Sequence, residues 1–374
     1  MEEAERDSGW YYATLPTGMF GFLLMITILI TSLPALRRKS YNAFYYVHVI
    51  CSFWIFVALS VHASTDFYFL VPGLALWIVD WGWRLFRGTS GGLGKKVVGT
   101  LENAGEGWYR ISLPASLTTI DESGVAEKEA AITHPVQSYN MVFPGISKIQ
   151  NHAFTAAKVG SGTEGSVFLL QRSQGKVPKK LDKEWTWKLG SVVPEVGSRR
   201  EVEIRVEGPY YPSDEGFAVA SKVICIVGGT GLTGAYSLAL WWLKNRSQDA
   251  RAEFQLVWTV RYNNTTNIRE WRELENMVAS VPNMTIRVHI SSVFGRIDAE
   301  VYLRKILLTG SRSTTALSTR HKAWVYISGP ESLLKSTEIA CLATRRSVGN
   351  SPRQQDSQPW NVEDLEWYSA KWEV

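Results

Sequence analysis

The feature that most constrains this chain is a pair of long charge-free runs near its N-terminus. Ser8–Leu36 and Ser40–Thr65 contain no Asp, Glu, Lys or Arg, and Phe67–Val79 is a third apolar run. Each of the first two runs can supply the roughly 20 apolar residues that a helix needs to cross a bilayer, and the third reaches that length only with its aromatic flank. We therefore predict a membrane segment over residues 1–90 with three transmembrane helices, at about 16–36, 42–63 and 67–86.

The basic residues predict the orientation of this segment. Arg37, Arg38 and Lys39 lie between the first two runs and further Lys and Arg residues follow the third, whereas the N-terminal start is acidic. Because positively charged loops stay on the cytoplasmic side, we expect the N-terminus outside and the large C-terminal part in the cytosol. No basic n-region or cleavage site precedes the first run, which argues against a removed signal peptide.

Charge and cysteine usage exclude some function classes. The net charge of +5 is small and lies mostly beside the membrane segment, so nucleic acid is a poor partner. The three cysteines are scattered and fit neither a disulfide framework nor a zinc site.

Two of the six histidines lie in the second apolar run. On one continuous helix, His48 and His62 share a face and are about 21 Å apart along the axis. Two interpretations are open. The imidazoles form hydrogen bonds to neighbouring helices, or they are axial ligands of two haems stacked across the bilayer.

A glycine turn in the C-terminal part points to a phosphate-binding site. "KVICIVGGTGLTGAYSLALWWLKN" predicts a strand at 222–227, a turn at 228–234 and a helix at 232–244. Backbone N–H groups of such a turn can bind a phosphate, although a tight turn without a ligand has the same pattern. The next predicted strand ends in Arg261, which suits the 2′-phosphate of NADPH but equally suits a solvated strand end.

The residues between the membrane segment and this turn predict a second domain. Short strands broken by Gly, Pro and Ser fill residues 95–216, which is typical of a small antiparallel barrel. We predict a β-barrel over 91–218 and an α/β domain over 219–374, the domain order of ferredoxin-reductase-like flavoproteins with FAD and NADPH.

Four stretches make the sequence resemble the fungal ferric-chelate reductases of the ferric reductase and NADPH oxidase superfamily. "LPALRRKSYNAFYYVHV" with "LSVHA" is similar to the helix pair that carries haem ligands, and "NHAFTAAK" to the His-Pro-Phe-Thr flavin motif. "VEGPYY" with "GGTGLTG" is similar to the NADPH entry and phosphate loop, and "VYISGP" to the Cys-Gly-Pro element beside the nicotinamide.

The resemblance implies a role for each matching residue. His48 would be the inner haem ligand and His62 the outer one. Phe154 and Thr155 would lie against the FAD ring, with His152 ordering the turn. Trp372 would stack on the flavin, or would merely fill a surface groove.

The resemblance likewise implies an NADPH site with Ser328 beside the path of the hydride. The residues that would bind NADPH come from the entry segment, the phosphate loop, the end of the next strand and the nicotinamide side. They are Glu207, Gly208, Pro209, Gly228, Gly229, Thr230, Gly231, Leu232, Thr233, Arg261, Gly329 and Pro330.

The sequence departs from the family pattern at three positions, which suggests altered turnover. Val136 replaces a glycine, Ala153 replaces a proline with its fixed φ, and Ser328 replaces a cysteine. The family holds each haem between two histidines, whereas the other four histidines here lie in the C-terminal part. We therefore expect a truncated product, an incomplete gene model, or one half of a complex whose partner supplies the missing haem-ligating helix.

The expected function is that of a plasma-membrane ferric-chelate reductase. Electrons would pass from NADPH through FAD, and through haem if partner helices are supplied, to ferric chelates. Two alternatives stay open: a superoxide-generating NADPH oxidase, which shares the electron path, and a degenerate, non-catalytic flavoprotein subunit tethered to the lipid bilayer.

Overall fold

The computed structural model describes residues 9–39, 41–62, 64–90, 95–114, 134–146, 151–160, 165–172, 185–212, 215–308, 322–349 and 362–371. The chain divides into two compact units between Leu93 and Gly94.

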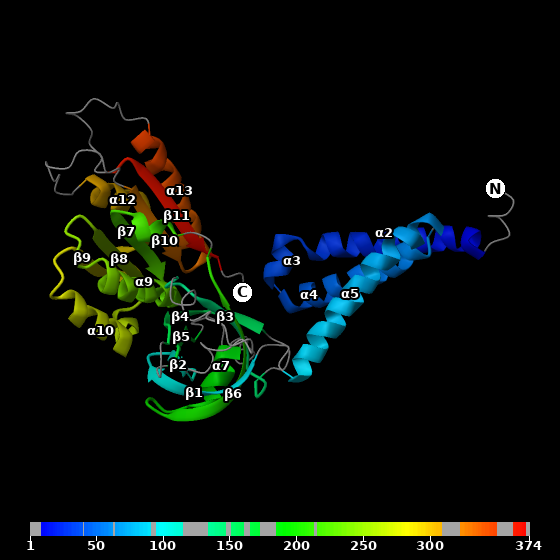
Figure 1. The fold of residues 1–374 in the computed structure, drawn as a ribbon, viewed down its shortest axis with the longest axis horizontal. Helices are drawn as coiled ribbons and strands as arrows, with labels where there is room; N and C mark the ends of the chain where they lie inside the picture. The colour runs from blue at the N-terminus through cyan, green and yellow to red at the C-terminus, as the bar shows by residue number, and fades with distance from the viewer. Residues whose placement is uncertain are drawn as a thin grey trace, which may run out of the picture. The chain divides into compact units, whose positions relative to one another are not determined.

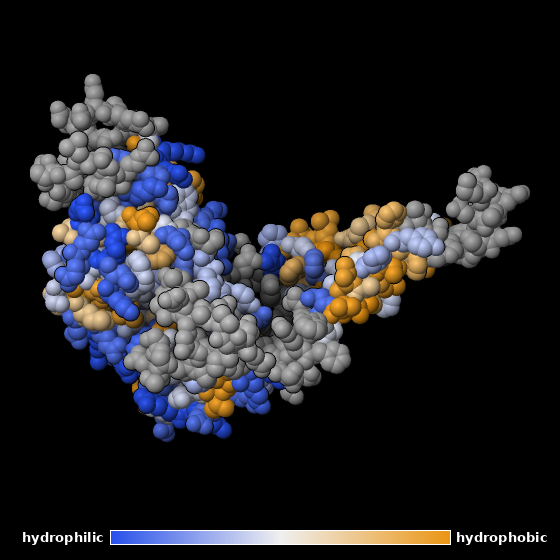
Figure 2. All heavy atoms as spheres, in the orientation of Figure 1, coloured by the Kyte–Doolittle hydropathy of each residue, from blue (hydrophilic) through white to orange (hydrophobic). Residues whose placement is uncertain are grey.

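The N-terminal unit is helical, as its apolar runs predict. It contains α2 (Gly9–Thr31), α3 (Pro34–Lys39), α4 (Tyr41–Ser60) and α5 (Ser64–Ser90). Helices α2 and α4 pack together, and both are long and apolar enough to cross a membrane. The apolar part of α5, Phe67–Asp80, is shorter, so the third span stays a prediction. Figure 2 shows hydrophobic residues over much of the visible surface of this unit, where the C-terminal unit is mainly hydrophilic.

The predicted helix at 42–63 ends early. Helix α4 stops at Ser60, and Val61 and His62 form a turn behind it. In this turn the His62 N–H donates to the carbonyl of Leu59 at 3.1 Å, which is the i→i+3 pattern of a tightened last turn. His62 therefore lies in the turn that directly continues the helix carrying His48, two residues beyond its end.

The C-terminal unit begins with the predicted antiparallel barrel, which closes in the order β1-β2-β5-β4-β3-β6. Its strands are β1 (Lys95–Gly105), β2 (Trp108–Ser112), β3 (Ser138–Val142), β4 (Asn151–Lys158), β5 (Val167–Gln171) and β6 (Arg199–Tyr210), with α7 (Trp185–Val192) between the last two. Alternate side chains such as Leu101, Ile111 and Phe168 fill its interior, because successive residues of a strand point to opposite faces.

A five-stranded parallel sheet follows, in the order β11-β10-β7-β8-β9. Its strands are β7 (Lys222–Gly228), β8 (Glu253–Val260), β9 (Met284–Ile290), β10 (Lys322–Ser328) and β11 (Asp364–Ala370). Its helical elements are α8 (Gly216–Val219), η3 (Gly229–Gly231), α9 (Leu232–Asn245), η4 (Asn263–Thr266), α10 (Arg269–Val278), α11 (Ser291–Phe294), α12 (Ala299–Leu308) and α13 (Glu331–Gly349).

Strand β7 lies at the centre of this sheet and is buried along its whole length. Its side chains alternate between two cores: Cys225 packs with α9, and Ile224 and Ile226 pack with α12 and α13 on the other face (Figure 1). The continuous apolar run of a parallel strand is explained by burial on both faces. The strand order reverses at β7, and such a point at the carboxyl ends of parallel strands is where open α/β sheets bind ligands.

Buried polar contacts join the barrel to the sheet within the C-terminal unit. Arg110 on β2 donates to both carboxylate oxygens of Glu270 on α10, at 2.6 and 2.9 Å, and a further N–H group donates to Glu102 at 2.8 Å. The indole N–H of Trp108 donates to the carbonyl of Thr265 at 2.9 Å. The predicted order of a barrel followed by an α/β domain is confirmed.

Candidate nucleotide and flavin site

The predicted phosphate turn forms at the carboxyl end of β7. Gly228 ends the strand, Gly229–Gly231 form the 3₁₀ turn η3, and α9 begins at Leu232. Gly229 has φ +54°, a conformation that glycine adopts without cost. The Trp258 indole N–H donates to the Gly229 carbonyl at 3.0 Å, so the neighbouring strand fixes the turn.

A second glycine segment, about 100 residues further along the chain, packs against this turn. A Cβ atom on Gly329, which has φ +137°, would lie 2.9 Å from the backbone nitrogen of Gly228. A Cβ atom on Gly231 would lie 2.6 Å from the carbonyl oxygen of Ser328, and one on Gly228 would lie 2.9 Å from Pro330. The structure therefore brings the predicted phosphate loop and the predicted nicotinamide segment together, and the contact leaves no room for side chains.

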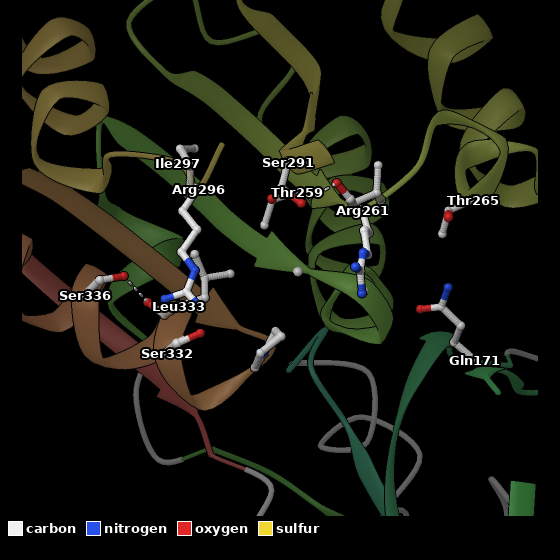
Figure 3. Close-up of a pocket in the computed structure, with 14 residues that line it drawn as sticks. Gln171, Thr259, Arg261, Thr265, Ser291, Arg296, Ile297, Ser332, Leu333 and Ser336 are labelled. Atoms are coloured by element: carbon white, nitrogen blue, oxygen red, sulfur yellow. Dashed lines mark hydrogen bonds between the residues drawn. The ribbon is translucent and has the colours of Figure 1, made fainter. Parts of the chain in front are cut away.

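Beside this contact lies a pocket of about 290 Å³ (Figure 3). It opens at the carboxyl edge of the sheet, where β7, β8 and β9 end. Of the predicted residues, Gly228, Gly229, Arg261 and Pro330 line it. Figure 3 shows that Gln171, from the end of β5, also lies at this pocket, so the barrel contributes to the wall.

The lining of the pocket is positively charged. The described residues that line it include Arg261 and Arg296 and no Asp or Glu. Among the described residues, neither arginine has an ion pair with a carboxylate, and the Arg261 guanidinium lies 5.3 Å from the ring centre of Tyr262. A pocket with two cations and no acid suits an anionic ligand.

Arg296 was missed by reasoning from the sequence. It lies between α11 and α12 in the connection that follows β9, just as Arg261 follows β8. Both residues come after the carboxyl end of a parallel strand, and that shared position is the signal that could have identified Arg296.

The predicted flavin motif lies in strand β4. Thr155 is buried and pairs with Ser138 on β3, while Phe154 is half-buried with its ring 6.4 Å from that of Phe143. Helix α9, which follows the phosphate turn, packs directly on β4. The half-buried ring and the buried hydroxyl on this strand fit the flat, partly polar ring of FAD, next to the nucleotide turn.

His152 is the second residue of β4, and its predicted role in ordering a turn stays a prediction. Burial lowers the pKa of its imidazole to about 4, since the charged form is poorly solvated there. His152 is therefore neutral at pH 7.

The predicted entry segment, Glu207–Pro209, lies at the end of β6. Strand β6 pairs with β3 on the side opposite β4, where Glu207 is opposite Asn140. Gly208 has φ +128°, and Glu207 and Gly208 are exposed. The structure thus places this segment across β3 from the flavin strand, but none of its residues lines the pocket.

The remaining predicted site residues of this unit range from exposed to buried. Thr230 is exposed, Leu232 and Thr233 are buried at the start of α9, and the Thr233 hydroxyl donates to the Thr230 carbonyl at 2.9 Å. Ser328 ends β10 and is 3% exposed, outside the pocket lining. Trp372 lies outside the described residues.

The structure accommodates two of the departures from the family pattern, Val136 in a buried core and Ala153 in strand β4. Val136 is buried in the core shared with α9, and its N–H donates to Nδ1 of His134 at 3.1 Å. Ala153 lies in β4 opposite Asn140, where its N–H is available to the strand ladder. A proline there would have no N–H to donate.

The two membrane histidines do not form one site. His48 is exposed on α4, with its ring 5.4 Å from that of Phe44. The His62 carbonyl accepts a hydrogen bond from Thr14 on α2 at 2.9 Å, and its ring nitrogen Nδ1 lies 3.3 Å from the Thr17 hydroxyl. His62 thus makes the contact with a neighbouring helix that the first interpretation proposes.

The described residues do not fit a haem held between two imidazoles. Such a haem needs two histidines on opposite sides of one iron, whereas the described membrane unit offers one histidine on α4 and one behind its end. Among the described residues, no group of three or more His, Cys, Asp or Glu side chains could hold a metal ion.

Comparisons with known proteins point to one family. Residues 2–59 match the family model of the ferric reductase like transmembrane component. Ferric reduction oxidase 8, mitochondrial, of Arabidopsis thaliana is 24% identical over 263 residues, covering 69% of this chain and 32% of that protein. Ferric reductase transmembrane component 1 of Schizosaccharomyces pombe is 22% identical over 303 residues, covering 72% of this chain and 51% of that protein.

This chain spans about a third to a half of the length of these two curated relatives. Among solved structures, the cytochrome b5 reductase domain of Ulva prolifera nitrate reductase is similar with a TM-score of 0.46 and 15% identity. That similarity covers 73% of this chain and 96% of that one.

Proposed function

We propose that this chain is a membrane oxidoreductase that passes electrons from NADPH through FAD to ferric chelates, like the ferric reductases to which it is similar. The single observation that supports this function best is the meeting of Gly228–Gly231 and Ser328–Pro330 beside a pocket with two arginines and no acid.

The proposed NADPH site follows the carboxyl edge of the sheet. The backbone of Gly228–Thr233 binds the pyrophosphate, as helix-opening glycine turns do. Arg261 binds the 2′-phosphate, and Gly329 and Pro330 border the nicotinamide. Ser328 lies next to the hydride path, and Glu207–Pro209 form the entry to the site.

The proposed flavin site is strand β4. Phe154 and Thr155 contact the isoalloxazine ring, and His152 supports the strand as a neutral residue. FAD, when bound, accepts two electrons as hydride and releases them one at a time, which matches NADPH to a ferric acceptor. Helix α9 orients the site because it links the phosphate turn to β4.

The proposal also includes the membrane anchoring and orientation of the chain. The N-terminal unit anchors the chain in the plasma membrane as a multi-pass segment, with the C-terminal module in the cytosol. We place the barrel domain at 91–218 and the nucleotide domain at 219–374, so that the boundary falls between β6 and β7. No electron step is assigned to haem, since the described residues do not fit one.

The test is a measurement on the full chain, purified in detergent and supplied with FAD. We expect bound flavin, and anaerobic formation of ferrous iron from a ferric chelate that depends on NADPH and is detected with a ferrous-specific dye. A chain that takes up no FAD would contradict the proposal. Superoxide in air without any ferrous iron would instead favour the oxidase alternative.

A further inference from the structure

We propose that Arg296 is a second specificity-determining residue, which binds the 2′-phosphate of NADPH together with Arg261. The inference rests on the proposed function, because it takes the pocket at the sheet edge as the dinucleotide site.

The two arginines reach one pocket from separate segments. Arg261 follows β8 directly, and Arg296 precedes α12 in the connection after β9. Figure 3 shows both side chains extending toward the interior of the pocket, with Arg261 on the side of Gln171 and Arg296 on the side of Ser332 and Ser336. Because both side chains line the same pocket of about 290 Å³, their guanidinium groups can bind one phosphate from two sides.

Local contacts hold the segment that carries Arg296. Gly295 has φ +73° with open space around its Cα, which allows the sharp turn after Phe294. Nε2 of His289, on β9, donates to the Gly295 carbonyl at 2.9 Å. On the other side, the Val301 N–H donates to Asp298 at 3.1 Å at the start of α12. Arg296 therefore lies between two anchored points.

The charge of the pocket favours a ligand with two negative charges. Other arginines of this unit, such as Arg110, Arg246 and Arg269, are paired with carboxylates. Arg261 and Arg296 have no such pair among the described residues, and no acid lines their pocket. Like charges that share a pocket repel each other, and a phosphate monoester, with a charge of about −1.5 to −2 at pH 7, relieves that repulsion.

The position of the arginines favours the 2′-phosphate over the pyrophosphate. Strand β10, which carries the nicotinamide segment, lies on one side of β7, and β8 and β9 lie on the other. The pyrophosphate belongs at the β7 turn, and both arginines follow strands on the side of the adenosine half. The anionic group of that half is the 2′-phosphate.

Two adenine nucleotides that differ only in the 2′-phosphate test this inference in the full chain by calorimetry. Adenosine 2′,5′-bisphosphate should bind more tightly than adenosine 5′-monophosphate. Arg296→Gln should weaken the bisphosphate by roughly 10- to 150-fold, the value of a lost charge-assisted hydrogen bond, and leave the monophosphate unchanged. Arg304→Gln is the matched control, because Arg304 is exposed on the adjacent helix α12, outside the pocket lining, and should change neither affinity.

A double variant sharpens the test. If Arg261 and Arg296 bind one phosphate, Arg261→Gln combined with Arg296→Gln should lose less affinity than the two single losses multiplied. Equal weakening of both nucleotides by Arg296→Gln, or no weakening, would overturn the role of Arg296 while wild-type discrimination upholds the proposed function. A wild-type chain that binds neither nucleotide would overturn both.

Discussion

The carboxyl edge of the sheet brings together residues that are far apart in the sequence, whereas the end of α4 separates two histidines that are close in the sequence. At the sheet edge, Gly228 and Gly329 are about 100 residues apart in the sequence and touch through their backbones. At the end of α4, His48 and His62 are 14 residues apart, yet one lies on the helix and the other in the turn behind it. A motif spacing is therefore informative only when the elements between the residues are known.

The two regions differ because a parallel sheet brings distant residues together, whereas the end of α4 depends on a contact with another helix. Parallel strands place all their carboxyl ends at one edge, so any residue that follows a strand of the sheet is brought near the others. The position of His62 depends instead on the capping of its carbonyl by Thr14, from another helix. The sequence around His62 has no Gly or Pro that would indicate the end of a helix.

The largest expected effect is a loss of stability when the buried ion pair between Arg110 on the barrel and Glu270 on α10 is broken. Burial lowers the pKa of Arg110, but the hydrogen bonds and charges of Glu270 and Glu102 outweigh burial and raise it. Arg110→Met would leave Glu270 as a buried carboxylate without its partner, which should cost about 3–5 kcal/mol of stability. Thermal unfolding of the full chain, followed by tryptophan fluorescence, measures this loss.

The double variant Arg110→Met/Glu270→Met is the control for that experiment. It removes both charges and should recover most of the lost stability, since apolar residues of similar size often replace a buried ion pair without loss. A single variant as stable as the wild type would show that the barrel and sheet do not depend on this pair.

The next effect tests the contact between the two glycine segments. Gly329→Ala places a side chain at φ +137° and against the backbone of Gly228. A strained backbone of this kind costs on the order of 1–3 kcal/mol, so NADPH binding should weaken by roughly 5- to 150-fold in a titration. The matched control is Gly349→Ala, whose Cβ would have no atom within 4 Å. Equal NADPH affinity in both variants would mean that the contact does not shape the site.

A smaller effect concerns the pH dependence of stability at the flavin strand. The pKa of His152 is lowered from 6.5 to about 4 in the folded chain, so the unfolded chain binds the proton more readily between these values. Stability should therefore be unaffected by His152 above pH 6.5 and should fall as the pH decreases toward 4. His152→Gln removes this contribution, so the unfolding temperature of the wild type should decrease relative to that of the variant as the pH falls from 6.5 to 4. A constant difference across this range would contradict the burial of a neutral imidazole.

Contiguous elements were predictable from the sequence, and contacts between distant elements were not. The strand, turn and helix at 222–245 follow from one uninterrupted pattern of apolar residues and glycines. The barrel strands follow from short runs between turn residues. The pocket could not be predicted, because Gln171, Arg296 and Ser336 come from three elements whose meeting depends on closure of the barrel and packing of α12 and α13.

The most direct test of the central claim compares the two regions in one experiment. The claim is that NADPH delivers its electrons at the sheet edge, independently of the membrane histidines. Anaerobic stopped-flow absorbance of the full chain follows reduction of bound flavin by NADPH. Wild type and His48→Ala/His62→Ala should reduce flavin at the same rate, and Gly329→Ala should be slower at limiting NADPH. Flavin reduction that is lost in the histidine variant but unchanged in Gly329→Ala would contradict the account.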